Sequence, residues 1–269
     1  LGQTLRQLSQ RHTALRLNGP QWRDIKWLWQ SKKHSHVNTF KSNSERLLRL
    51  AQYSALQRQN WVDTLHLDYE QNQGVMLLLR GERDVEKLAP TLDVWRDCGI
   101  EFQTLNAEQA RAIEPALRPD TALAQALHFA QDDVGNCRQF TLLLKQEAER
   151  LGVEFYFNTP IQPLSRTTPT LLQTSQRSEK FDAVVVCAGL GGTDLVKPLG
   201  LKLPSIGLQG YTLSAVVREP IDAPKGGIVD DRYKVSISRL GQRVRLSGGH
   251  ELGQHPTHLA ASLKRSEEH

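Results

Sequence analysis

The chain has 269 residues, of which 39% are hydrophobic and 23% charged, with a formal net charge of +5. These proportions are typical of a globular protein, and no apolar run approaches the roughly 20 residues that span a bilayer. Basic residues are scattered rather than clustered beside aromatic residues, which argues against a nucleic-acid-binding protein. The mild positive charge suits the attraction of anionic substrates or of a membrane surface equally well.

The cysteines give no sign of a metal or disulfide framework. Cys98, Cys137 and Cys187 lie far apart and form no CxxC motif. We therefore expect reduced, buried or half-buried thiols. Three histidines occur in HELGQHPTH (residues 250–258), but glycine and proline in this stretch keep them off a single helix face. No structural metal is expected.

The first half of the chain predicts long helices followed by mixed structure. Leu47, Leu50 and Trp61 recur at helical spacing on one face of a long helix. Asn106 is a good N-cap for a later, short helix. In chain order, the predicted elements are a helix over 42–63, a strand pair at 65–70 and 74–80, a helix over 82–97 ending at Gly99, a strand over 100–105, a helix over 106–114 and a strand over 122–133.

The second half predicts a helix, several strands and a glycine-rich turn. A strand that is apolar throughout is typical of a sheet covered on both faces. FDAVVVCAG (residues 181–189) has this composition and runs directly into a turn with further glycines. The predicted elements are a helix over 136–152, strands over 153–160 and 181–189 with a hairpin at 164–180 between them, a β-rich region from 210, a hairpin turning at 240–242 and a helix at 259–269.

Three stretches of the chain carry a family resemblance through their order. They are 135–164, 181–214 and 231–249, preceded by the helical stretches WRDIKWLWQ and RLLRLAQYS. This succession resembles the bacterial D-amino acid dehydrogenases, flavoenzymes of the glycine oxidase and D-amino acid oxidase superfamily. The resemblance covers nearly the whole chain in order.

The resemblance implies an α/β (α+β) fold: an incomplete FAD-binding Rossmann-like domain interleaved with a mixed-sheet substrate domain carrying helices. Residues 1–130 and 204–269 would belong to the substrate domain, and residues 131–203 to the middle of the FAD-binding domain. Family members also carry an early GxGxxG unit and a late arginine-bearing segment, and the sequence contains neither. We therefore expect this sequence by itself to bind FAD weakly or not at all.

The resemblance also implies where the cofactor would be contacted. The backbone of Ile161, after the NTP bend, would lie beside the adenine of FAD. Ala188 and Gly189 would pass under the cofactor, where a side chain at Gly189 would push the backbone away. The alternatives remain a β-branched core residue at Ile161 and a plain strand-to-helix turn at Gly189.

Tyr233 is the candidate substrate residue, because its family counterpart donates a phenol hydrogen bond to the amino acid carboxylate. Alternation along a strand would place Tyr233, Val235 and Ile237 on one face, as in a pocket wall. Tyr211 is a second candidate, and ordinary half-buried strand tyrosines are the alternative for both. The implied chemistry is transfer of hydride from the substrate Cα to FAD, giving an imino acid that hydrolyses to a 2-oxo acid and ammonia.

Several functions stay open. The first is FAD-dependent D-amino acid dehydrogenation with a quinone or other membrane-linked acceptor, and the others are an inactive flavoenzyme remnant and a glycine or sarcosine oxidase. The sequence does not determine the oligomeric state. Trp22, Trp27 and Trp29, with their neighbouring lysines, suit either contact with a membrane surface or packing on the core. We expect a cytoplasmic protein, with peripheral attachment to the inner face of the bacterial plasma membrane as an alternative.

Overall fold

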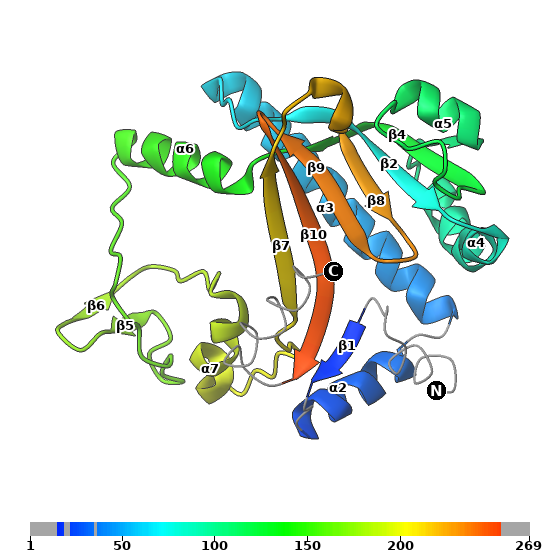
Figure 1. Cartoon of the computed structure of the whole chain (residues 1–269). Helices are drawn as coiled ribbons and strands as arrows, with labels where there is room; N and C mark the ends of the chain where they lie inside the picture. The colour runs from blue at the N-terminus through cyan, green and yellow to red at the C-terminus, as the bar shows by residue number, and fades with distance from the viewer. Residues whose placement is uncertain (1–14, 19–21, 35–36, 254–269) are drawn as a thin grey trace.

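The computed structural model describes residues 15–18, 22–34 and 37–253. Within these residues, eight strands form one mixed sheet in the order β1-β10-β9-β8-β2-β4-β3, with β7 also paired to β10 (Figure 1). The fold is therefore mixed α/β, as the sequence predicts. The strands of this sheet are β1 (Leu15–Asn18), β2 (Asn72–Leu79), β3 (Gln103–Leu105), β4 (Gln125–Val134), β7 (Gln209–Val216), β8 (Gly227–Asp230), β9 (Val235–Leu240) and β10 (Arg243–Gly253).

The helices and a separate hairpin account for most of the remaining elements. Several predicted helices are confirmed, and the first of them is longer than expected because it begins at residue 37. The elements are α2 (Trp22–Lys33), α3 (Val37–Leu65), α4 (Glu82–Asp97), α5 (Ala107–Ile113), α6 (Cys137–Arg150), α7 (Gly192–Val196) and the hairpin of β5 (Leu171–Gln173) and β6 (Ser178–Lys180).

β2 is the central strand of the core, and it is buried on both faces. It pairs antiparallel with β4 and parallel with β8. Met76 and Leu78 pack on one side with Ile228. On the other side Leu77 packs with Leu127 and with Leu92 of α4. A run of apolar residues therefore forms this strand because neighbours cover both of its faces.

Local signals set the ends of the helices. Asn106 caps α5: its Oδ1 accepts a hydrogen bond from the Gln109 N–H at 2.9 Å, and Gln109 Oε1 accepts one from the Asn106 N–H at 3.0 Å. Gly99, just after α4, has a φ of +72°, a conformation that glycine adopts without steric cost. The hairpin predicted at 240–242 is also confirmed, since Leu240 of β9 pairs with Arg243 of β10.

Polar contacts tie α3 to the end of β4, just before α6 begins. Arg58 donates to Asp133 at 2.6 Å and also to the Tyr69 hydroxyl. Burial raises the pKa of the Tyr69 phenol, although the Arg58 guanidinium opposes the shift. The outward side of α3 exposes Leu47 and Leu50, so the apolar face predicted for this helix is not buried against the sheet.

Three predicted strands are wrong. Residues 66–71 follow α3 as an irregular segment, with His66 and Glu70 in left-handed conformations that no strand contains. Residues 153–160 and 181–188 are also irregular, and Val185 is 84% exposed. No strand within the described residues pairs with either segment, and an apolar composition cannot form a strand without a partner.

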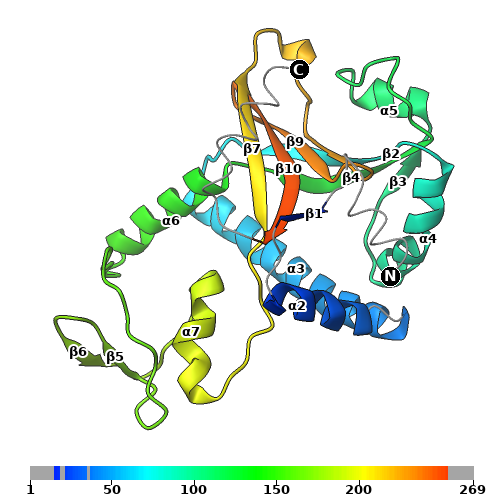
Figure 2. The ribbon, with the colours of Figure 1, turned by 60° about the horizontal axis from the view of Figure 1, so that its bottom comes forward.

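Residues 151–208 form a unit set apart from the sheet, and Figure 1 and Figure 2 show this from two directions. The hairpin predicted at 164–180 is confirmed by the pairing of β5 with β6. The Leu164 N–H donates to the Leu195 carbonyl at 2.9 Å, and this bond joins the segment before β5 to α7. The domain limits given above remain a prediction, and the helix predicted over 259–269 lies outside the described residues.

Candidate functional site

The two substrate candidates lie on either side of one glycine of the sheet. Tyr211 of β7 pairs with Gly248 of β10. On the opposite side of β10, a Cβ at Gly248 would lie 3.2 Å from the Lys234 carbonyl and 2.8 Å from Val235 Cγ2. Gly248 thus lets the backbone just after Tyr233 approach β10 closely, on the side of β10 opposite to Tyr211.

Tyr233 lies in a turn rather than in a strand, contrary to the predicted alternation. Asp230 pairs with Val235 across the β8–β9 hairpin, which leaves residues 231–234 as the connection. Tyr233 is 47% exposed, and its backbone N–H donates to Asp230 Oδ1 at 3.3 Å. Its side chain is therefore accessible while its backbone is fixed.

Glycines are the site residues that the sequence predictions miss. Gly249 has a φ of +64°, and a Cβ there would lie 3.2 Å from the Tyr211 ring. The β10 register also shifts between Gly248 and Glu251. Two adjacent glycines inside a strand signal such a bulge or close approach, so the pair was recognisable from the sequence.

The cofactor candidates all belong to the unit of residues 151–208. Ile161 is half-buried three residues before Leu164, whose backbone bonds to Leu195 of α7. Ala188 and Gly189 begin the short turn that leads into α7. A backbone hydrogen bond therefore links the segment that follows Ile161 to the helix that follows the Gly189 turn.

The Gly189 turn is open to solvent. Gly189 has a φ of +53°, and a Cβ at this position would meet no atom within 4 Å. Ala188 and its neighbours are exposed, so their backbone groups can be reached. The predicted contact of Ala188 and Gly189 with FAD stays a prediction.

The cysteine prediction needs a correction. Cys98 is half-buried as expected, whereas Cys137 and Cys187 are exposed. Cys137 is the first residue of α6, and Cys187 belongs to the segment that forms no strand, so neither thiol is covered. All three are free thiols.

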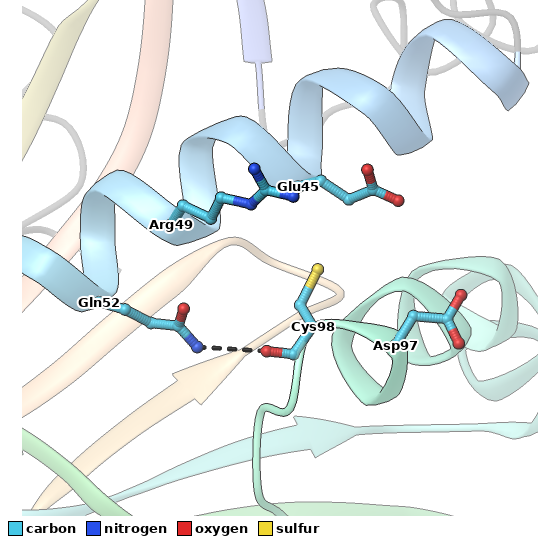
Figure 3. Close-up of a pocket in the computed structure, with 5 residues that line it drawn as sticks. All are labelled: Glu45, Arg49, Gln52, Asp97 and Cys98. Carbon is cyan, nitrogen blue, oxygen red and sulfur yellow. Dashed lines mark hydrogen bonds between the residues drawn. The ribbon is translucent and has the colours of Figure 1, made fainter.

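A polar cavity of about 390 Å³ lies between α3 and the end of α4 (Figure 3). Gln52 donates to the Cys98 carbonyl at 3.2 Å across it, and beside it the Lys41 ammonium pairs with Asp97 at 2.6 Å. None of the predicted site residues lines this cavity, which is bounded by Glu45, Arg49, Gln52, Asp97 and Cys98.

Solved structures share this fold at low sequence identity. Glycine oxidase from Geobacillus kaustophilus has a TM-score of 0.65 at 19% identity, covering 83% of this chain and 58% of its own. Iminodiacetate oxidase from Chelativorans sp. BNC1 gives 0.64 at 16% identity, with 81% and 61% covered. L-proline dehydrogenase from P. horikoshii gives 0.61 at 14% identity, with 76% and 56% covered.

The chain thus spans less than two thirds of the length of these enzymes. The sequence model of one family, the FAD dependent oxidoreductases (DAO), matches residues 12–268. This match takes in both the sheet with its two tyrosines and the unit with the Gly189 turn. The chain therefore belongs to the DAO family of oxidoreductases, whose cofactor is FAD.

Proposed function

We propose that the protein catalyses FAD-dependent oxidative deamination of D-amino acids, giving 2-oxo acids and ammonia, and passes the electrons to a quinone-type acceptor. The observation that carries the proposal is the placement of Tyr211 and the Tyr233 turn on either side of Gly248. Similar folds in glycine oxidase and L-proline dehydrogenase support an amino acid as the substrate class.

The tyrosines would hold the substrate by its carboxylate. A phenol O–H is a donor suited to a carboxylate oxygen, and Tyr233 is exposed enough to reach one. Holding the carboxylate fixes the position of the Cα whose C–H bond breaks. FAD, when bound, supplies the two-electron oxidation, which leaves a C=N bond that water hydrolyses.

Replacement of Tyr233 with phenylalanine tests the substrate contact. Losing one hydrogen bond to a charged group weakens binding by about 1.5–3 kcal/mol, so we expect KM for the D-amino acid to rise about tenfold or more. Steady-state kinetics of the FAD-loaded protein measures this. Tyr53→Phe on the exposed side of α3 is the matched control and should leave KM unchanged.

The substrate class is tested by comparing enantiomers. We expect a set of D-amino acids, but not their L-enantiomers, to reduce a soluble quinone analogue and to release ammonia. Turnover of glycine or sarcosine alone would favour the oxidase alternative. A preparation that retains FAD and turns over none of these substrates would favour the inactive remnant.

One face of α2 supports delivery of electrons at a membrane. Trp22, Ile25 and Trp29 recur at helical spacing and are exposed, Trp22 by 78%. Trp27 turns the other way and donates to the Pro204 carbonyl at 2.9 Å. Lys26 is exposed beside the apolar side chains, so this face combines aromatic groups with positive charge. No helix in the described part of the chain has the length and hydropathy to cross a bilayer.

Vesicle binding tests the α2 face. We expect sedimentation with vesicles containing phosphatidylglycerol, reduced by salt, and weaker sedimentation with phosphatidylcholine alone. The double variant Trp22→Ser, Trp29→Ser should bind at least about tenfold less tightly, because each buried tryptophan contributes roughly 1.5–3 kcal/mol. Val216→Ser on β7 removes an equally exposed apolar group elsewhere and should bind normally. Equal vesicle binding by the tryptophan double variant and by Val216→Ser would contradict a membrane-binding role for the α2 face.

A further inference from the structure

We propose that Asp230 is a positioning residue for the substrate: its carboxylate sets the turn from which the Tyr233 phenol reaches the substrate carboxylate. The inference deepens the proposed function and rests on the substrate role of Tyr233 given there. Asp230 itself would touch neither substrate nor cofactor.

One oxygen of Asp230 organises the turn. Oδ1 accepts a hydrogen bond from the Arg232 N–H at 3.1 Å and another from the Tyr233 N–H at 3.3 Å. An aspartate that bonds to the backbone two and three residues ahead folds the chain over itself. The backbone of Tyr233 is therefore held by the residue that ends β8.

The other oxygen anchors Asp230 to the central strand of the sheet. Oδ2 accepts from Arg80 Nε at 2.7 Å, and a second Arg80 nitrogen lies at 2.7 Å from the same oxygen. Asp230 is only 5% exposed, and a carboxylate so buried needs such a partner. Because Arg80 directly follows β2, this ion pair ties the turn to the buried central strand of the sheet.

Two further contacts hold the same loop. Arg232 donates to the buried carboxylate of Asp84 on α4 at 2.7 Å. The Asp231 N–H donates to the Leu78 carbonyl of β2 at 3.1 Å. Residues 231 and 232 are thus fixed to the core, and Lys234 lies in the left-handed region, while the side chain of Tyr233 remains exposed.

Two substitutions at one position separate positioning from the ion pair. Asp230→Asn and Asp230→Ala both lose the charge that pairs with Arg80, but only asparagine keeps an oxygen that accepts the two N–H groups. We expect KM for the D-amino acid to rise about tenfold in the alanine variant and to stay near the wild-type value in the asparagine variant, with kcat changed less than KM. Asp230→Val makes the same comparison if the alanine variant does not fold.

A double-variant cycle with Tyr233→Phe provides the control. If Asp230 acts through Tyr233, the Asp230→Ala, Tyr233→Phe protein should have the KM of Tyr233→Phe alone. Additive effects, or equal effects of asparagine and alanine, would overturn the positioning role while leaving the proposed function intact. A Tyr233→Phe variant with an unchanged KM would instead contradict the substrate role of Tyr233, and with it the positioning role of Asp230.

Discussion

Replacing Leu127 with alanine should lower the free energy of unfolding by about 3 kcal/mol, within the range measured for fully buried leucines. Leu127 of β4 is fully buried between Leu77 of β2 and Thr104 of β3, and it packs with Leu92 of α4. Removing its side chain leaves a cavity that two paired strands cannot collapse to fill. Chemical denaturation monitored by circular dichroism measures the loss.

Leu213→Ala on β7 is the matched control for this cavity. Leu213 is exposed, so its truncation should change the free energy of unfolding by less than about 1 kcal/mol. Equal losses in the two variants would show that the core around β2 and β4 is not organised as described.

Gly226→Ala should lower the free energy of unfolding by about 3 kcal/mol, at the upper end of the usual range for overpacking. A Cβ at this buried position would lie 2.3 Å from the Gly74 carbonyl oxygen and 2.8 Å from that of Gln73. Both contacts are with backbone, which cannot rotate away as a side chain can. The start of β8 would have to separate from β2, and β8 leads directly to Asp230.

Gly191→Ala is the control for Gly226→Ala. Its φ is −66°, and a Cβ there would meet nothing within 4 Å, so its stability should stay within about 0.5 kcal/mol of wild type. Thermal unfolding of the two variants side by side gives the comparison. A Gly226→Ala protein as stable as Gly191→Ala would contradict the close approach of β8 to β2.

Features set by a few neighbouring residues were predictable from the sequence. The Asn106 cap and the Gly99 stop both act within one turn of the chain, and the structure confirms them. The tight hairpin at 240–242 is predictable for the same reason, with Gly241 at a φ of +57°. Each needs only its own backbone geometry and nearby donors.

Features that depend on distant partners were not predictable. The segments 153–160 and 181–188 have strand-like composition, but strand formation needs a second strand beside them. The same limit applies to Asp230, whose role depends on Arg80, 150 residues earlier in the chain. The bonds from Asp230 to its own turn were predictable from the sequence, because an aspartate before a turn often accepts backbone N–H groups two or three residues ahead.

Anaerobic mixing of the FAD-loaded protein with single enantiomers tests the central claim most directly. We expect D-amino acids to bleach the visible flavin absorbance with stoichiometric formation of the 2-oxo acid and ammonia, and the L-enantiomers to leave the absorbance unchanged. Bleaching by L-amino acids would contradict the proposed specificity for D-amino acids. A protein that carries a full complement of FAD, none of it reduced by any D-amino acid, would contradict the proposed activity itself.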